Sequence, residues 1–290
     1  MINILLCTSG NLKNLRRCVF SISKINYKKK INLILINNSK NLLVKNILTN
    51  TKFKKNFNIF YKNEKKMGIP NARNASINLS KKLKSDYTCF FDDDCIIPKN
   101  WLTQMIKIKD LKLAKIITGP QVPLSNNIYE KVIARNEKHM SEVKWAATNN
   151  VFISSQVLKK EKIFFDIDLL NIGGSDQLFF LKLSKKYKIL WNEDAKVYEM
   201  SQSIRKNFMW FFYRNIRFGS SSFIIYRKNY NLYLSIIICC VKSLKELLVS
   251  IISLVNIFNF KYSILKSIQY ITRSIATFFS IFGFVVKEYK

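Results

Sequence analysis

The stretch that decides the fold reads Tyr87-Thr88-Cys89-Phe90-Phe91-Asp92-Asp93-Asp94-Cys95. Its first part, residues 87–91, is aromatic and apolar, which favours a buried β-strand. Three consecutive carboxylates follow at the point where this strand leaves the sheet, and ligands of open α/β sheets bind at that edge. Because adjacent acids repel one another unless a cation or hydrogen-bond donors lie among them, residues 92–94 predict a site for Mg²⁺ or Mn²⁺. The alternative is a solvated acidic turn.

The segments around this stretch alternate between strand and helix patterns. Short apolar runs predict strands at 2–7, 31–36, 57–61, 115–118, 149–153, 188–191 and 196–199. Helix-start signals follow several of them, at Asn11, Gly68, Pro98 and Gly173-Gly174. Strands that alternate with helices predict an α/β fold with βαβ units and a mostly parallel, buried sheet.

The chain is strongly basic. Its 290 residues include 49 Lys+Arg and 18 Asp+Glu, which gives a net charge of +31. Such a surface attracts anionic partners, such as nucleotide phosphates or an acidic membrane face. A compositional bias is the alternative, because lysine far outnumbers arginine. The sequence contains no recognisable nucleic-acid-binding module, so we expect no nucleic-acid partner.

The cysteines and the start of the chain indicate a reducing compartment. The sequence has six cysteines and one histidine without zinc-site spacing, so we expect buried, reduced thiols. Residues 1–7 have the pattern of a strand and differ from a secretory signal. Together with the C-terminal segment described next, these features predict a location at the cytoplasmic face of the cell membrane, either peripheral or inserted through that segment.

The character of the sequence changes at residue 204. Residues 204–230 alternate basic and aromatic side chains, which suits a helix at a membrane interface. Residues 231–290 are apolar but are interrupted by charges, so 18 uninterrupted apolar residues do not occur. We expect an interfacial or re-entrant helical hairpin there, with a helical extension of the core in water as the alternative. The expected domains are therefore 1–203, 204–230 and 231–290.

Three motifs in this order resemble the family 2 inverting glycosyltransferases of the GT-A fold. They are Gly68 to Asn74, Asp92-Asp93-Asp94 after a strand, and Gly173-Gly174-Ser175-Asp176. The resemblance is closer to the bacterial exopolysaccharide branch typified by the succinoglycan glucosyltransferases, and it covers roughly residues 1–222. That branch is matched at Ala72-Arg73-Asn74, Pro98, Trp101-Leu102, Gly119-Pro120, Asn149-Asn150, Phe179-Phe180, Ala195 to Glu199, Arg214, Arg217 and Gly219.

The resemblance implies an activity and roles for the acids. A sugar would pass from a nucleotide-diphosphate-sugar, most simply a UDP-sugar, to a lipid-linked or growing polysaccharide acceptor at the cytoplasmic membrane face. Asp94 would bind the metal directly, Asp92 would lie near the ribose or the metal, and Asp93 could serve either role. Glu199 is a further candidate metal ligand. Asp176 would be the general base that accepts the proton of the attacking hydroxyl, and its alternative role is to cap its helix.

The nucleotide side of the site is assigned in the same way. The residues expected to bind the nucleotide-sugar are Thr8, Ser9, Asn37, Asn38 and Arg73, together with Asp92 and Asp93. Two positions depart from the family pattern. Asn37 stands where relatives often have an aspartate that contacts uracil, and Ser175 stands where they have an acid before the base.

Three other functions stay open at this point. A polyprenyl phosphate could itself be the acceptor. A nucleotidyltransferase shares the α/β fold and an acidic metal pair. A basic module without enzymatic activity could use the acids for metal-dependent folding.

Overall fold

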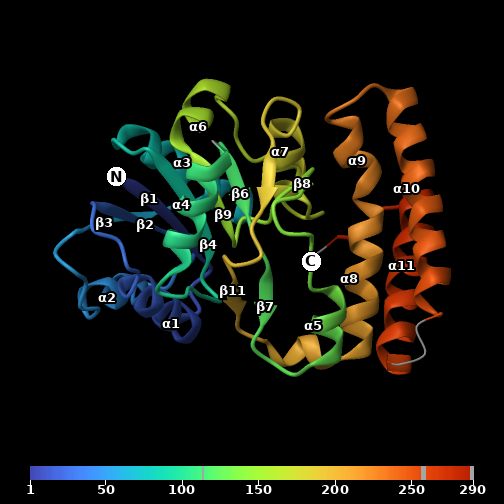
Figure 1. The fold of residues 1–290 in the computed structure, drawn as a ribbon, viewed down its shortest axis with the longest axis horizontal. Coiled ribbons are helices and arrows are strands. Elements are labelled where there is room, and N and C mark those ends of the chain that lie inside the picture. The colour runs from blue at the N-terminus through green and yellow to red at the C-terminus, as the bar shows by residue number, and fades with distance from the viewer. Residues whose placement is uncertain (113, 256–258, 288–290) are drawn as a thin grey trace. The chain divides into compact units, whose positions relative to one another are not determined.

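The computed structural model describes residues 1–112, 114–255 and 259–287, and Figure 1 traces their helices and strands. The chain forms two compact units. The first contains residues 1–124, 135–167 and 179–200, and the second contains residues 125–134, 168–178 and 201–290. The domain boundaries expected at residues 203 and 230 stay a prediction.

The first unit is built on an eight-stranded sheet. Its strands, in sheet order, are β3 (Phe57–Asn63), β2 (Ile31–Asn37), β1 (Ile2–Thr8), β4 (Tyr87–Asp92), β9 (Val151–Ser154), β6 (Ile116–Thr118), β10 (Ile189–Trp191) and β8 (Glu142–Val143). The four strands from β3 to β4 are parallel, β9 is antiparallel to both of its neighbours, and β10 is parallel to β6. The predicted α/β fold with a mostly parallel sheet is confirmed.

Helices cover both faces of this sheet (Figure 1). They are α1 (Leu12–Ser23), α2 (Val44–Thr49), α3 (Ile69–Lys82), α4 (Trp101–Lys112) and α6 (Ser155–Glu161). Successive side chains of a strand point to opposite faces, so Leu6 of β1 packs with α1, α2 and α4, whereas Leu5 packs with α3 and α6. Burial on both faces explains why these strands are almost continuously apolar.

Three asparagines interrupt the apolar strands at one rung of the sheet. Asn3, Asn32 and Asn58 are paired in register on β1, β2 and β3. Asn32 Nδ2 donates to Asn3 Oδ1 at 2.7 Å, and Asn58 Nδ2 donates to Asn32 Oδ1 at 2.9 Å. This amide ladder satisfies polar groups that would otherwise be costly to bury.

A small second sheet completes the first unit. It contains β5 (Cys95–Ile96), β11 (Val197–Glu199) and β7 (Gln121–Pro123), with β11 in the middle. The sequence predicts β11 but not β5, β7 or β8. Strands β5 and β8 have two residues each, too few to carry a pattern, and β7 contains a single apolar side chain between Gln121 and Pro123. Glu199 of β11 is paired with Cys95 and with Pro123.

The second unit is helical. Its helices are α5 (Ile128–Ile133), η2 (Ser203–Lys206), α8 (Phe208–Ser220), α9 (Ser222–Arg227), α10 (Leu232–Ser253) and α11 (Phe260–Ser280), and α7 (Ser175–Leu183) begins in it. The basic aromatic segment expected as one helix over 204–230 is thus divided among three helices.

The C-terminal helical hairpin expected from the sequence is present as α10 and α11, which run side by side (Figure 1). Residues 256–258 and 288–290 of the expected apolar segment lie outside the described residues. Gly219 allows α8 to approach α11 closely, since a Cβ there would lie 2.6 Å from the carbonyl oxygen of Arg273. Over the described ranges, no helix is long and apolar enough to cross a membrane.

Candidate active site

The carboxylate stretch lies at the carboxyl end of β4, beside the end of β1. Asp92 is the last residue of β4 and is registered with Cys7 of β1. Asp92 Oδ1 accepts a hydrogen bond from Arg73 Nη2 at 3.0 Å. The Arg73 side chain is only 9% exposed, and its guanidinium lies over the ring of Phe165. Arg73, which the sequence assigns to the nucleotide, therefore fixes the orientation of Asp92.

Asp93 joins the turn to the loop that follows β1. Thr8 Oγ1 donates to Asp93 Oδ2 at 2.5 Å, and the backbone N–H of Ser9 donates to the same carboxylate. The Gly10 N–H in turn donates to Thr8 Oγ1 at 3.0 Å. Burial raises the pKa of Asp93 above its ordinary value, and the hydrogen bond from Thr8 partly opposes this rise. The structure thus brings together three of the predicted residues, Thr8, Ser9 and Asp93.

Asp94 is buried and lies close to β11. The carbonyl oxygen of Asp94 accepts from the Met200 N–H at 2.8 Å, one residue after Glu199. Burial raises the pKa of the neighbouring Cys95 thiol well above its usual range, and the charges of Asp92, Asp94 and Glu199 act in the same direction. The thiol of Cys95, between the predicted ligand Asp94 in the chain and the predicted ligand Glu199 across the sheet, therefore stays protonated at neutral pH.

The donor set suits a hard cation that also binds the substrate. Carboxylate oxygens are the ligands that Mg²⁺ and Mn²⁺ prefer. Among the described residues, no group of three or more His, Cys, Asp or Glu side chains converges as a ready metal site. Mg²⁺ is commonly bound through one or two carboxylates plus substrate phosphates, and Asp92 and Asp94 fit that arrangement.

Asn37 and Asn38, at the end of β2, are both buried and shape the neighbouring loops. Asn38 Oδ1 accepts from the Gly68 N–H at 2.8 Å, directly before α3 begins. Its Nδ2 donates to the carbonyl oxygens of Glu64 and Lys66. The Asn37 amide hydrogen-bonds Ser39, Asn41, Tyr61 and Asn63. A contact of either asparagine with a nucleotide base stays a prediction.

Several motifs that carry the family resemblance meet at Asn150. Trp101 Nε1 donates to Asn150 Oδ1 at 2.9 Å. Asn150 Nδ2 donates to the carbonyl oxygens of Pro120 at 2.9 Å and Ala195 at 2.8 Å. A Cβ at Gly119 would lie 2.7 Å from the Ala195 carbonyl oxygen, so only glycine fits beside this cluster. These motif residues therefore hold the two sheets together.

Thr148 and Asn149 were not assigned a role from the sequence. Both are buried, and the Thr148 hydroxyl and the Asn149 carboxamide oxygen have no hydrogen-bond partner among the described residues. The pairing of β9 with β4 ends at Val151 and Phe90, so Asn149 lies two residues beyond it, level with Asp92. Buried polar groups are normally paired, so these two atoms are exceptions in the segment that leads into β9. The repeated asparagine was the available sequence signal.

Asp176 occupies the first turn of α7 and is half-buried. The two glycines before the helix adopt positive φ, 85° at Gly173 and 79° at Gly174, which explains why glycine stands at both positions. A Cβ at Gly174 would lie 2.5 Å from Ile225 Cδ1, so α7 begins close against α9. Asp176 belongs to the second unit and the carboxylate stretch to the first, and its role as base stays a prediction.

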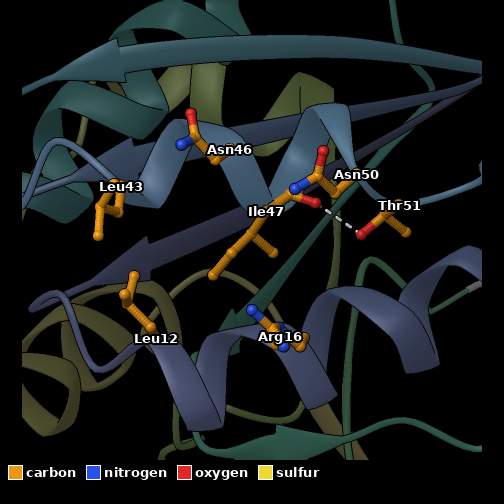
Figure 2. A pocket seen from close by; sticks show the side chains of 7 residues that line it. All are labelled: Leu12, Arg16, Leu43, Asn46, Ile47, Asn50 and Thr51. Atoms are coloured by element: carbon orange, nitrogen blue, oxygen red, sulfur yellow. Dashed lines mark hydrogen bonds between the residues drawn. The ribbon is translucent and has the colours of Figure 1, made fainter.

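A cavity of about 410 Å³ lies between α1 and α2. Figure 2 shows its lining residues, which include Leu12 and Arg16 of α1 and Ile47 of α2, with Thr51 bonded to the Ile47 carbonyl oxygen. None of the predicted site residues lines it. The chemistry is therefore expected at the edge of the sheet and not in this cavity.

The mostly parallel sheet, its helical layers and its acidic carboxyl edge define a GT-A-type α/β fold. The sequence profile of the family described as Glycosyl transferase family 2 matches residues 4–165. The chain therefore belongs to glycosyl transferase family 2, and the predicted glycosyltransferase class is confirmed. The finer assignment to the exopolysaccharide branch stays a prediction. A search of curated protein sequences gave no significant match.

Solved structures share the fold at low sequence identity. Staphylococcus aureus TarS 1–349 in complex with UDP-GlcNAc has a TM-score of 0.55 and 15% identity, over 70% of this chain and 59% of that chain. A complex of TarS 1–349 with UDP matches with 13% identity and a TM-score of 0.55, over 98% of this chain and 92% of that one. Pyrobaculum calidifontis mannosyltransferase PcManGT, solved with GDP-Man and Mn²⁺, has a TM-score of 0.62 and 10% identity, over 95% and 86% of the two chains.

Proposed function

We propose that this chain transfers a sugar from a nucleoside-diphosphate sugar, with a UDP-sugar as the first candidate, to an acceptor hydroxyl with inversion at the anomeric carbon. The observation that carries the proposal is the carboxylate stretch Asp92–Asp94 at the carboxyl end of β4, in a family 2 domain. The nucleotide sugars bound by TarS and PcManGT support a donor of this class. Family membership favours sugar transfer over the nucleotidyltransferase and the basic binding module.

Asp92 and Asp94 are the residues that would hold a divalent cation, with Glu199 next to them. When bound, Mg²⁺ or Mn²⁺ would offset the negative charge that develops on the diphosphate leaving group. Arg73 is a positioning residue in this proposal, because its guanidinium fixes Asp92 Oδ1 at 3.0 Å. Thr8 and Asp93 hold the loop after β1 in place for the donor.

Asp176 is the proposed general base. Its carboxylate would accept the proton of the acceptor hydroxyl as the oxygen attacks the anomeric carbon from the face opposite the diphosphate. A single displacement of this kind inverts the anomeric configuration. The two left-handed glycines before α7 fix the start of the helix that carries Asp176.

The acceptor we propose is a lipid-linked or growing polysaccharide at the cytoplasmic face of the cell membrane. Its support is the motif resemblance to the exopolysaccharide branch. Polyprenyl phosphate is the alternative acceptor within the same chemistry.

The test measures turnover of a panel of UDP- and GDP-sugars in the presence of Mn²⁺. The release of the nucleoside diphosphate is the measured signal. We expect Asp94→Asn to lower turnover on the order of a thousandfold, because a cation ligand stabilises the transition state by several kcal/mol. Asp176→Asn is expected to lower transfer about 10²- to 10⁴-fold and to leave donor binding intact.

Asp110→Asn is the matched control, since this carboxylate is exposed on α4 of the same unit. Its turnover should equal that of the wild type. Full turnover in both the Asp94 and the Asp176 variants would remove the assigned roles. Release of pyrophosphate from a nucleoside triphosphate would replace sugar transfer by nucleotidyl transfer.

A further inference from the structure

Helix α10 carries an apolar stripe on its exposed side. The stripe consists of Ile237, Val241, Leu244, Leu248 and Ile252, spaced three or four residues apart, and each side chain is between 57% and 67% exposed. Residues with this spacing lie on one face of a helix. Large continuous apolar patches are uncommon on soluble monomers and mark interaction surfaces. We refer to these five residues as the α10 stripe.

Helix α11 adds a second apolar face. Ile271, Ile275 and Phe278 follow one another at helical spacing and are 39%, 52% and 44% exposed. Phe282, directly after the helix, continues the row and is 73% exposed. Because α10 and α11 pack against each other, each helix of the pair presents an apolar row to the outside.

The side chains between the two helices are polar instead. Ser243 and Ser274 are buried, and each hydroxyl donates to the other residue's carbonyl oxygen, at 3.0 and 2.8 Å. Two helical turns further along α10, the Ser250 hydroxyl donates to the Ser267 carbonyl oxygen at 3.1 Å. Small hydroxyl side chains at a helix–helix contact allow close backbone approach and are typical of helices in an apolar surrounding.

Charged residues are also turned inward. Lys242 Nζ lies 3.9 Å from Glu246 Oε1, and Thr277 Oγ1 donates to Glu246 Oε2 at 3.3 Å. Burial raises the pKa of Glu246 and lowers that of Lys242. Arg273 Nε donates to Asn215 Oδ1 at 2.8 Å, and burial lowers the pKa of Arg273 to about 10. A helix pair surrounded by water normally shows the reverse arrangement, with aliphatic side chains inside.

Charge separates the two main candidates for the surface that covers the α10 stripe. A second copy would bring together two chains that each carry a net charge of +31. An anionic bilayer instead offers the opposite charge and attracts exposed lysines and arginines. Helix α8 supports the bilayer, because Phe208 and Tyr213 are exposed and Arg214 lies over the ring of Trp210. Aromatic and basic side chains together suit the headgroup region.

We propose that the α10 stripe and the apolar row of α11 dock on a lipid bilayer that contains anionic headgroups. The aliphatic side chains enter the boundary between headgroups and acyl chains, and the serine and charged side chains stay buried among the helices of the second unit. This surface would bring the second unit to the membrane. It stands independently of the chemistry at Asp92–Asp94.

The test is sedimentation of the full chain with vesicles of phosphatidylcholine and phosphatidylglycerol in a ratio of about 3:1. The variant is Leu248→Gln with Ile252→Gln, which removes two exposed apolar side chains, leaves the net charge unchanged and keeps good helix formers. We expect vesicle affinity to fall about tenfold or more. Wild-type binding should also weaken on pure phosphatidylcholine and at high salt.

Leu42→Gln with Leu43→Gln is the matched control, because both leucines are exposed in the first unit. This control should bind vesicles like the wild type, and all three proteins should turn over the donor equally, which separates this proposal from the proposed function. Equal sedimentation of the Leu248/Ile252 variant and the wild type would overturn the bilayer. A wild-type dimer that the variant dissociates, without vesicle binding, would assign the surface to a second copy instead.

Discussion

The sheet of the first unit and the helix pair α10–α11 of the second unit distribute polar and apolar side chains in opposite ways. Strands β1 and β2 bury their apolar side chains between two helical layers. Apart from the amide ladder of Asn3 and Asn32, their polar residues, Thr8 and Asn37, stand at the carboxyl edge. Helices α10 and α11 bury serines against each other and the cations Lys242 and Arg273 against α9 and α8. They expose leucine, isoleucine and phenylalanine. The first arrangement is that of an enzyme core in water. The second leaves an exposed apolar surface of the kind that marks interaction sites.

The two units also differ in how they satisfy their buried polar groups. In the first unit, single asparagines such as Asn150 make several hydrogen bonds to neighbouring segments. In the second unit, buried ions such as Glu246 and Lys242 depend on one another. Neutral amides leave no charge behind when they are removed, whereas ions do. Substitutions in the two units can therefore test whether buried amides and buried ions contribute differently to the free energy of unfolding.

The largest loss of stability is expected for Asn150→Ala. The substitution removes the hydrogen bonds that Asn150 makes with Trp101 Nε1 and with the Ala195 carbonyl oxygen. The Pro120 carbonyl oxygen loses Asn150 as well but keeps the Val197 N–H. Each unsatisfied buried group costs about 1–3 kcal/mol, so we expect the free energy of unfolding to fall by about 4 kcal/mol. Urea unfolding followed by circular dichroism measures the change.

Asn149→Ala is the control for this prediction. Asn149 is also a buried asparagine, but its carboxamide oxygen has no hydrogen-bond partner among the described residues. We expect a clearly smaller loss, because no such cluster depends on it. Equal losses at the two positions would mean that the cluster around Asn150 does not hold the two sheets together.

A smaller loss, about 3 kcal/mol, is expected for Glu246→Gln in the second unit. Glutamine keeps the shape of the side chain and can still accept from Thr277, but the buried Lys242 and Arg273 lose the carboxylate that offsets their charge. Lys242 can release its proton, which limits the loss. The measurement is the unfolding free energy of the full chain.

Glu142→Gln serves as the surface control, since Glu142 lies 3.4 Å from Lys144 in an exposed pair. Exposed ion pairs contribute about 0–1 kcal/mol, so this variant should unfold like the wild type. An unchanged stability of Glu246→Gln would show that the charges of Glu246, Lys242 and Arg273 are not coupled. The two units would then differ in where their polar groups lie but not in how these groups contribute to stability.

Much of the sheet could be predicted from the sequence because its signals are local. Each of the longer strands is an apolar run that ends in a turn, and Gly68, Gly173 and Gly174 mark helix starts through backbone conformations that glycine adopts readily. The three acids mark the site edge for the same reason. The turn that holds Asp92 to Asp94 can thus be predicted from the sequence.

The contacts across the chain could not be predicted in this way. The pairing of Arg73 with Asp92 joins α3 to the end of β4, and the bond from Thr8 to Asp93 joins residues that are 85 positions apart. The burial of the α10 serines could not be predicted either, because a sequence gives the spacing of polar residues but not the side on which a partner helix lies. An apolar hairpin could be expected, but not its polar interior.

The smallest effect is expected for Asp93→Asn, and its sign distinguishes it from the two losses above. Burial raises the pKa of Asp93, so the folded protein keeps this proton to higher pH than the unfolded chain, whose carboxyl titrates near the ordinary value of 3.8. Between these two pKa values the folded state binds more protons, and stability therefore falls as the pH rises through that window. Above the window the buried charge lowers stability by a constant amount.

Asparagine removes this charge and the repulsion from Asp92, and its Oδ1 can still accept from Thr8. We therefore expect Asp93→Asn to raise the melting temperature slightly at neutral pH, and the gain to vanish as the pH falls below the ordinary value. Thermal unfolding across this pH range, with Asp110→Asn as the exposed reference, measures both. A lower melting temperature at neutral pH would mean that the Asp93 charge, held by Thr8 and Ser9, stabilises the site edge. The carboxylate edge would then depend on a charge, as the buried ions of the second unit do. It would differ in this from the neutral asparagine hydrogen bonds of the first unit, to which it belongs.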